Sequence, residues 1–435
     1  MKAVRVYRLR HLPDALFHRI MDGMAESARV WNLCMEMHKK ARQDTPPNGG
    51  VQDKTPWPDK NDFHKATKGK FELYSQSVQQ VFRTFAGSIA SASRRRAGGD
   101  KGAEYPHREK RLYPLMWPAQ AVCVERGVRT RIVLPMGRGR PSVVLKLNEL
   151  PSDVGAVKIV WDNGLELHVQ TETPPVENSN ARAGVRACVD LGEIHLAAVA
   201  TNEGDALVVS GRGIRSHKRL NNKVNGEISK LQSRCKRGSR RWKKLAAARR
   251  KLNGRIKRRI RDARHQATHA VVEFCAQRGV ETLFVGNPDG VRKNPKGKKF
   301  NQKLSQWEYG RDKQYLKEKA ERAAIECFTG SERFTSSTCP ECGCRRRPKG
   351  RRWICPGCGF AGHRDVVGAV NMHAFTFGER VEFPEETRIT YLRPASDSRR
   401  RAGRNAASSS SPDTGQSCLK AGRAGSCTAY GCSPR

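Results

Sequence analysis

Two Cys-x-x-Cys pairs lie close together in the last quarter of the sequence. The four cysteines are Cys339, Cys342, Cys355 and Cys358. A glycine follows the second cysteine of each pair, which lets backbone N–H groups point at the sulfurs. This spacing predicts a tetrahedral structural Zn²⁺ site on four thiolates, with a redox pair or disulfides as the alternatives. Because four thiolates leave no open position, the zinc itself is not expected to be catalytic.

Acidic residues flank these cysteines, Glu332 before the first pair and Asp365 after the second. A third acid, Asp190, ends a run that reads as a buried strand. Mg²⁺ prefers oxygen ligands, and two such ions about 4 Å apart can activate water for phosphodiester hydrolysis. Alone, Asp190 reads as a strand-end turn residue and Asp365 as a helix N-cap. Together, in this order around a zinc site, they favour metal ligation.

The charge of the chain predicts a polyanionic partner. Lysine and arginine number 83 against 42 aspartates and glutamates, a formal net charge of +41. Nucleic acid is the leading candidate and a membrane surface the second. No apolar run approaches the roughly 18 residues of a spanning helix. The first residues alternate like a strand rather than a signal peptide. Several cysteines in apolar surroundings read as buried thiols of a reducing cytoplasm: Cys34, Cys123, Cys188, Cys275 and Cys327.

Periodicity divides the first 183 residues into strands and helices. Residues 1–12 read as a strand, and helical spacing follows from Pro13 and again from Ser75 to the basic run Arg94–Arg96, with a loop at 43–62. Short β-branched runs fill 105–173, and Asp162-Asn-Gly164 is a hairpin signal. We expect a small β-barrel completed by the N-terminal strand, with the helices inserted, and a linker over 176–183.

The second half predicts three strands, the first ending at Asp190, and then helices and strands in alternation. With acids at strand ends, this order describes an RNase H-like core. Its segment 211–268 is helical and carries about twenty Lys and Arg against two acids, which favours nucleic-acid contact over a solvated face. His265 and His269, one turn apart, are a weak metal pair, and helix packing or phosphate contact is favoured.

Several of these motifs together resemble the TnpB family of transposon-encoded RNA-guided DNA endonucleases, relatives of the compact type V CRISPR effectors. The resemblance covers most of the chain. The short motifs that carry it are Val189-Asp190-Leu-Gly192, Leu304-Ser-Gln-Trp307, Phe334-Thr335-Ser336-Ser-Thr-Cys339-Pro-x-Cys342-Gly, the second cysteine pair, and His363-Arg-Asp365-Val-x-Gly-Ala-x-Asn371.

The resemblance implies a multidomain α/β protein: an RNase H-like (RuvC) nuclease core with an inserted zinc ribbon, plus an N-terminal wedge β-barrel carrying a helical recognition insert. The implied boundaries are 1–12 and 105–176 for the barrel, 13–104 for the insert, 184–335 and 360–378 for the nuclease core with its basic helical hairpin at 211–268, 336–359 for the zinc ribbon, and 379–435 for a disordered tail.

The family's first and third catalytic acids correspond to Asp190 and Asp365. Its second acid often ends the fourth strand, where this chain has Gly286 and Asn287. Some members have glycine there and a glutamate just before the first cysteine pair, which corresponds to Glu332. Asp190, Glu332 and Asp365 are therefore the expected catalytic Mg²⁺ ligands. Asp289 and Glu193 are weaker substitutes for the second acid.

The resemblance also implies the partners: a guide RNA and a double-stranded target DNA, whose sequence is read by pairing with the guide. It implies a cytoplasmic prokaryotic protein, associated with the nucleoid when bound to DNA. The main alternative is a nuclease-dead RNA-guided DNA-binding repressor, which Gly286 would support. A strand transferase lacks its expected tyrosine and histidine constellation here. A general zinc-ribbon RNA-binding protein would not need Asp190.

Overall fold

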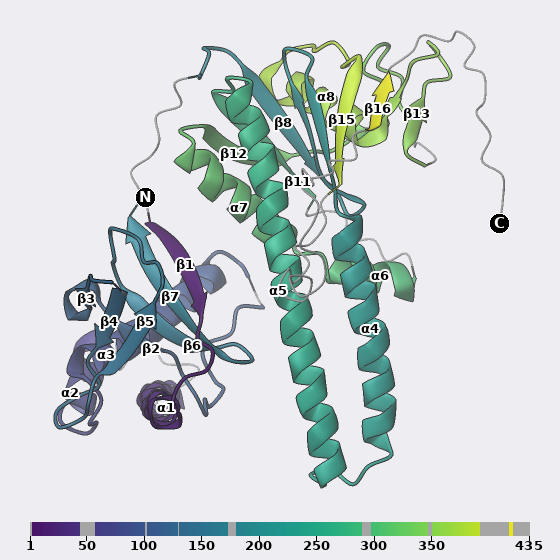
Figure 1. Ribbon diagram of the computed structural model, residues 1–435. Coiled ribbons are helices and arrows are strands. Elements are labelled where there is room, and N and C mark those ends of the chain that lie inside the picture. The colour runs from purple at the N-terminus through teal and green to yellow at the C-terminus, as the bar shows by residue number, and fades with distance from the viewer. Residues whose placement is uncertain are drawn as a thin grey trace, which may run out of the picture. The chain divides into compact units, whose positions relative to one another are not determined.

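The computed structural model describes residues 2–43, 57–100, 102–128, 130–172, 180–288, 297–346, 350–391 and 417–420 (Figure 1). The chain divides into two compact units, residues 1–174 and 175–435. Among the described residues, no helix is both long enough and apolar enough to cross a bilayer.

The first unit surrounds one apolar core with helices and short strands. Its two antiparallel sheets have the orders β1-β7-β6-β2 and β3-β4-β5. The strands are β1 (Lys2–Arg8), β2 (Leu115–Trp117), β3 (Cys123–Glu125), β4 (Thr130–Leu134), β5 (Val143–Leu147), β6 (Val157–Trp161) and β7 (Leu165–Glu172). The helices are α1 (Asp14–Gln43), α2 (Lys60–Thr67) and α3 (Ser75–Ala97).

Strand β1 pairs along its whole length with β7, so the N-terminal strand joins strands that follow the helices, as the sequence predicts. The hairpin expected at Asp162-Asn-Gly164 joins β6 to β7, with Asn163 and Gly164 at φ of 54° and 139°. The described strands form two sheets rather than one hydrogen-bonded ring. Strand β2 ends at Trp117 because Pro118, which has no N–H to donate, follows it.

Helix α2 lies partly inside the segment 43–62 that the sequence predicts as a loop. Asp59 caps it by accepting hydrogen bonds from the backbone N–H groups of Asn61 and Asp62, at 2.7 and 2.9 Å. Asp62 in turn accepts from the backbone of Asp59, which completes a capping box. The remainder of that predicted loop, residues 44–56, lies outside the described residues.

The second unit is built on a seven-stranded sheet of order β12-β11-β8-β9-β10-β15-β16. Strands β8, β9 and β10 form an antiparallel meander, and β11 and β12 run parallel to β8. The strands are β8 (Arg186–Leu191), β9 (His195–Thr201), β10 (Ala206–Ser210), β11 (Thr282–Asn287), β12 (Glu326–Ser331), β15 (Glu386–Tyr391) and β16 (Ser417–Lys420). Every residue of β9 and β10 is buried, because helices cover both faces of the sheet.

Five helices and one small hairpin complete this unit. They are α4 (Arg212–Ser233), α5 (Arg240–Gln277), α6 (Lys298–Ser305), α7 (Tyr309–Arg322), α8 (Arg364–Phe377) and the strands β13 (Arg352–Ile354) and β14 (Ala361–His363). Helices α5 and α7 bury one face of the sheet, and α8 covers the other. Helices α4 and α5 pair as a long hairpin that extends beyond the sheet (Figure 1).

The segment after residue 378 differs from the disordered tail that the sequence predicts. Strand β15 pairs in parallel with β10, and β16 pairs antiparallel with β15. Thr387, Ile389 and Tyr391 supply the β-branched and aromatic alternation of a strand, and the edge of β10 supplies the hydrogen-bonding partners. A low apolar content over the whole tail therefore concealed one short strand-forming run. Residues 392–416 and 421–435 lie outside the described part of the chain.

Candidate active site and zinc centre

Strand β8 directs Asp190 toward helix α8. Ala187, Val189 and Leu191 of this strand face the core shared with α5 and α7. Because side chains alternate along a strand, Asp190 faces the opposite side. There it meets Gly368 of α8 so closely that a Cβ atom at residue 368 would lie 2.4 Å from Asp190 Oδ2. The helix thus approaches the sheet at the acid itself.

Glu332 fills the space that a side chain at Gly286 would occupy. Val285 of β11 pairs with Val189 of β8, so Gly286 follows in register beside Asp190. A Cβ atom at Gly286 would lie 2.5 Å from Glu332 Oε2 and 3.2 Å from Glu332 Cβ. Glu332 follows β12, the neighbour of β11, and its carboxylate lies over the backbone of β11. A glutamate placed after β12 and a glycine in β11 therefore form a complementary pair.

Asp365 lies in the first turn of α8, where two basic side chains hold its carboxylate. His195 at the start of β9 donates from Nδ1 to Oδ2 at 2.7 Å. Arg351, just before β13, donates from Nη1 to Oδ1 and Oδ2 at 2.8 and 2.9 Å. Neither residue was a sequence-based candidate. His195 follows Asp190-Leu-Gly by a few residues, but nothing in its local sequence indicates a contact with a helix 170 residues away.

The three acids share one electrostatic environment. Burial raises the pKa of Asp190 well above its usual value, and the charges of Glu332 and Asp365 raise it further, against the opposing effect of Arg364 and Arg351. Burial also acts to raise the pKa of Asp365, but the His195 hydrogen bond and Arg351 outweigh it and hold that pKa low. Three carboxylates this close repel one another, and a cation bound between them would relieve that repulsion.

Tyr309, the first residue of α7, is a further neighbour of this cluster. Burial raises the pKa of its hydroxyl, and the charges of Glu193, Glu332 and Asp190 contribute in the same direction. Its hydroxyl therefore lies within electrostatic reach of two of the expected ligands. The sequence offers a weak signal for it, because Tyr309 stands two residues after the Trp307 of a recognised motif.

The weaker substitutes for the second acid have other partners or cannot be placed. Glu193 forms an ion pair with Arg215, in which Nε lies 3.0 Å from Oε1. Asn287 accepts from Lys313 Nζ at 2.5 Å. Asp289 lies outside the described residues. Of the two substitutes that the sequence offers, Glu193 is therefore held by Arg215 and Asp289 is not described.

Gly368→Ala is expected to disturb the site without removing an acid. The added Cβ atom would overlap Asp190 Oδ2, so either the carboxylate or α8 must shift. Overpacking of this kind costs about 1–3 kcal/mol. We expect a lower melting temperature and a loss of any activity that depends on Asp190. Gly310→Ala on α7, where a Cβ atom meets nothing within 4 Å, is the matched control and should keep the activity without lowering the melting temperature.

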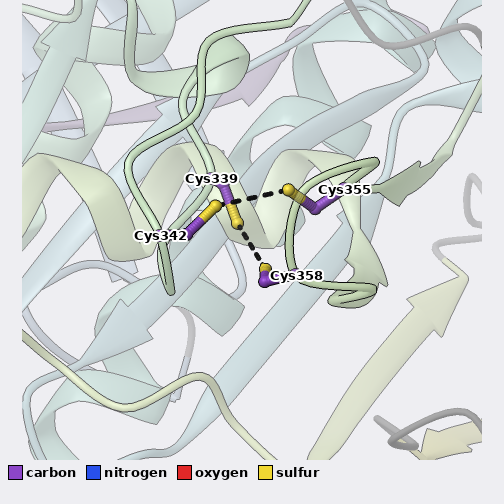
Figure 2. A group of neighbouring side chains, drawn as sticks. All are labelled: Cys339, Cys342, Cys355 and Cys358. Atoms are coloured by element: carbon purple, nitrogen blue, oxygen red, sulfur yellow. Dashed lines mark hydrogen bonds between the residues drawn. The ribbon is translucent and has the colours of Figure 1, made fainter.

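The four cysteines of the two Cys-x-x-Cys pairs converge at one point, as the sequence predicts (Figure 2). Their sulfurs lie within 4.8 Å of one another, with Cys339–Cys358 at 3.7 Å and Cys342–Cys355 at 3.4 Å. Four sulfurs about 2.3 Å from one zinc ion would lie roughly 3.8 Å apart. The arrangement therefore fits a tetrahedral zinc ion.

At both Cys-x-x-Cys pairs, backbone N–H groups point at a cysteine sulfur and stabilise its thiolate form. Gly343 and Gly359 each have a φ of 72°, the left-handed conformation that a tight turn requires. Burial acts to raise the pKa of Cys355, but N–H groups of Cys358 and Gly357 outweigh it and lower that pKa to about 6. At Cys339 burial dominates and raises the pKa to about 12, although N–H groups of Cys342 and Glu341 act in the opposite direction.

Hydrogen bonds tie the zinc centre to the acid on α8. Asn371, one of the motif residues, donates from Nδ2 to the carbonyl oxygens of Thr335 and Thr338, both at 2.7 Å. These residues precede the first cysteine. On the other side, the backbone N–H of Arg364 donates to the carbonyl of Arg351 at 2.8 Å. The segment that carries the cysteines is thus fastened to α8 on both sides of Asp365.

The motif residue Trp307 anchors the long hairpin to the core. It is buried, and the guanidinium of Arg264 on α5 lies 5.6 Å from its ring. Arg264 and Asp312 form a buried ion pair at 2.5 Å. Burial raises the pKa of Asp312 to about 6, although Arg264 acts to lower it. This pair fixes α5 against α7, and hence the base of the hairpin against the site.

A basic cavity of about 650 Å³ opens between α4 and the segment before α7. Its cationic residues come from α4: Arg212, Arg215, Lys218, Arg219 and Lys223. The amides of Asn222 and Gln306 hydrogen-bond reciprocally in its wall, at 3.0 and 3.1 Å. Glu193, whose charge reaches Tyr309, also lines it. Glu193 thus belongs both to the cavity wall and to the electrostatic surroundings of Tyr309.

The two histidines near the end of the basic segment have different surroundings. His265 stacks on Tyr315 of α7, with ring centroids 4.1 Å apart and an interplanar angle of 25°. His269 is exposed and faces Glu273 one turn later, at 3.8 Å. The sequence-based preference for helix packing therefore holds for His265.

Comparisons with known proteins agree with these features. Residues 166–292 match a family model described as "Probable transposase" (OrfB_IS605), and residues 309–372 match the "Cas12f1-like, TNB domain". The chain is 24% identical over 188 residues to the TnpB-like protein MJ0751 of Methanocaldococcus jannaschii. That alignment covers 42% of this chain and 66% of the relative, just under two thirds of its length.

The fold is similar to that of a solved Cas12f1-sgRNA-target DNA complex, with a TM-score of 0.56 at 12% identity over 82% of both chains. At this identity the likeness concerns the fold. It agrees with a compact multidomain α/β architecture of the type V kind.

Proposed function

Because this chain belongs to the TnpB family, we propose that it is a transposon-associated, RNA-guided DNA endonuclease that hydrolyses target DNA at a single RuvC-type site. The nuclease core is then residues 184–335 and 360–378, with the zinc ribbon at 336–359. Residues 1–12 and 105–176 form the wedge and 13–104 the recognition insert. The strand order β10-β9-β8-β11-β12, antiparallel and then parallel, supports an RNase H-like sheet.

The observation that best supports this proposal is that the charges of Glu332 and Asp365 both act on Asp190, although the three acids come from the segment after β12, from α8 and from β8. The carboxylate of Asp190 lies against α8 at Gly368, and that of Glu332 lies against β11 at Gly286. The charges of Glu332 and Asp365 both raise the pKa of Asp190. A structural ion pair would instead place a base beside Asp190 as its nearest partner.

The donor set fits Mg²⁺, because three carboxylates supply the oxygen ligands that this ion prefers. Asp190, Glu332 and Asp365 would hold it. When bound, Mg²⁺ makes water a stronger nucleophile and stabilises the leaving 3′ oxygen of a phosphodiester. In this chain His195 and Arg351 orient the carboxylate of Asp365. Arg351 and Arg364 supply positive charge beside a site that must receive a phosphate.

The basic hairpin and cavity supply the binding surface for guide RNA and target DNA. Exposed lysines and arginines follow α4 and α5 toward their free end, while α5 buries one face from Gly254 onward. Phosphates on this surface would displace counterions, so affinity should fall steeply with salt. Such a strand would also bind in the cavity between α4 and the segment before α7, where five arginine and lysine side chains of α4 line the wall.

A plasmid-cleavage assay tests the function. The protein is purified with the RNA transcribed from its own locus, and that RNA is reprogrammed to a chosen target. We expect Mg²⁺-dependent scission of the matched plasmid and none of a mismatched plasmid. Guide-directed binding of the matched plasmid without scission would instead favour the nuclease-dead RNA-guided DNA-binding repressor. RNA binding without either binding or scission of the matched plasmid would contradict both the nuclease and the repressor.

The position of the second acid can be tested by exchange. Glu332→Ala is expected to abolish scission, whereas Glu193→Gln should retain it because Glu193 pairs with Arg215. Gly286→Glu alone should also fail, since its Cβ atom would overlap Glu332 Oε2. The double variant Gly286→Glu/Glu332→Ala removes that overlap and returns a carboxylate beside Asp190, although the flexible end of Met372, 2.7 Å from the added Cβ atom, must still move. It should recover part of the rate, measured as single-turnover cleavage by the ribonucleoprotein. Full activity of Glu332→Ala would exclude this residue as a ligand.

A further inference from the structure

Two histidines lie beside Asp365 and together with it form a second cluster with the composition of a metal site. One ligand atom each of His195, His363 and Asp365 lies within 4.8 Å of the other two. His195 ends the turn after β8, and His363 ends β14 of the small hairpin. The cluster therefore draws one residue from the sheet, one from the zinc-binding segment and one from α8.

A simple carboxylate–histidine pair accounts for only part of this arrangement. His195, buried in the core, donates to Asp365 Oδ2 at 2.7 Å and needs no third member. The ring of His363 nevertheless lies 5.0 Å from that of His195. Its Nδ1 atom is buried and makes no hydrogen bond among the described residues. Buried imidazole nitrogens normally have a partner, so this one calls for an explanation.

We propose that His195, His363 and Asp365 bind a first-row transition metal ion such as Zn²⁺, Co²⁺ or Ni²⁺. The ion would take the place of the proton between His195 and Asp365, and His363 would supply the third ligand. Nitrogen and oxygen ligands about 2.0–2.2 Å from zinc lie roughly 3.5 Å apart. The His195–Asp365 separation of 2.7 Å would therefore open slightly, and the His363 nitrogen would approach from at most 4.8 Å. Imidazole selects such ions over Mg²⁺. This site is distinct from the four cysteines.

Arg351 occupies the carboxylate of Asp365, so an ion bound there would either displace its guanidinium or lie beside it. Its Nη1 atom donates to both oxygens of Asp365. The side chain is 38% exposed, so it can turn toward solvent without opening the core. Metal binding would then exchange one cation on Asp365 for another. The buried His195 and the backbone of α8 need not move.

Occupation of this site would inhibit the proposed nuclease, and this consequence rests on the proposed function. An ion held by the two histidines and a Mg²⁺ ion at the acids would compete for the carboxylate of Asp365. Micromolar Zn²⁺ should therefore slow Mg²⁺-dependent cleavage. The binding itself does not depend on any nuclease activity.

Metal binding is tested on the whole chain with its four cysteines already filled by zinc. The protein is titrated with Co²⁺ or Ni²⁺ and its metal content is measured after gel filtration. We expect one additional ion per chain, with the weak visible spectrum of nitrogen and oxygen ligands rather than the intense charge transfer of thiolate-bound Co²⁺. His363→Ala should weaken this binding at least tenfold. His269→Ala, an exposed histidine elsewhere on the unit, is the matched control and should bind as the wild type does.

A second variant protects the test against misfolding. His195→Asn keeps an N–H donor for Asp365 but removes the imidazole ligand, and its melting temperature reports whether the fold persists. Wild-type affinity for the added ion in folded His195→Asn or His363→Ala would overturn the proposal. So would charge-transfer bands showing that all Co²⁺ sits on cysteines. A bound ion in a protein that cuts no DNA would leave this site standing and overturn the nuclease. Cleavage by His363→Ala should resist at least tenfold more Zn²⁺ than wild-type cleavage does.

Discussion

Asp190→Asn is expected to slow guide-matched DNA cleavage by at least about a thousandfold while leaving guide RNA and target binding intact. Removing one member of a group that acts as a unit costs nearly as much as removing the whole unit. The amide is isosteric and keeps the close contact with Gly368. The measurement is the single-turnover cleavage rate, with binding followed separately by gel shift. Asp262→Asn on the exposed part of α5 is the control and should cut at the wild-type rate.

The same substitution should raise the melting temperature of the protein measured without Mg²⁺. Burial raises the pKa of Asp190, and the negative charges of Glu332 and Asp365 raise it further. A neutral amide removes the repulsion and the desolvation cost of the charge. Greater stability together with lost activity is the pattern of a functional acid. A destabilised variant would instead assign Asp190 a structural role.

The pH dependence of stability should separate Asp190 from Asp365. The folded pKa of Asp190 is raised, so its proton stabilises the fold fully below the unfolded pKa of about 4 and that stabilisation is lost as pH rises through the folded pKa. The folded pKa of Asp365 is lowered, so its contribution is present above about pH 4 and is lost as pH falls through the folded pKa. In Mg²⁺-free buffer, Asp190→Asn should therefore remove the fall in melting temperature above about pH 4. It should leave the fall on the acid side.

Cys355→Ser is expected to release the zinc ion and to abolish DNA cleavage. Structural zinc in small zinc-binding modules contributes on the order of 10–16 kcal/mol to folding, so the loss of one thiolate should unfold the segment between β12 and α8. Arg351 and the start of α8 would lose their fixed positions, because the Arg364 N–H to Arg351 carbonyl bond closes this segment. Asp365 would then no longer be held beside Asp190.

Metal content and melting temperature measure this effect directly. We expect one zinc ion fewer per chain and a lower melting temperature for the second unit. Cys344→Ser is the matched control, since Cys344 lies next to the knuckles but is outside the cluster of four sulfurs. It should retain zinc and activity. Equal zinc content in Cys355→Ser and the wild type would show that the four cysteines do not form the site.

The two expected effects connect the zinc centre with the acids. The cysteines lie between the element that carries Glu332 and the helix that carries Asp365. Asn371 and the Arg351–Arg364 backbone bond fasten that segment to α8 at both ends. A zinc ion on these cysteines would therefore have a structural role, and it would not need to take part in hydrolysis. The loss of activity in Cys355→Ser would follow from misplacement of Asp365.

Local patterns in the sequence predicted the four-cysteine cluster, the basic hairpin, and Asp190 and Asp365 as candidate ligands, because spacing, charge and strand-end position can be read over a few adjacent residues. Glu332 needed the family resemblance, since Gly286 occupies the usual position of the second acid. Only the tertiary structure showed why the exchange fits: Glu332 lies over Gly286, and Asp190 lies against Gly368. The tertiary structure alone also placed His195, Arg351 and Tyr309 near these acids. Their contacts join segments far apart in the chain, and burial changes their electrostatics, so neither effect leaves a local pattern in the sequence.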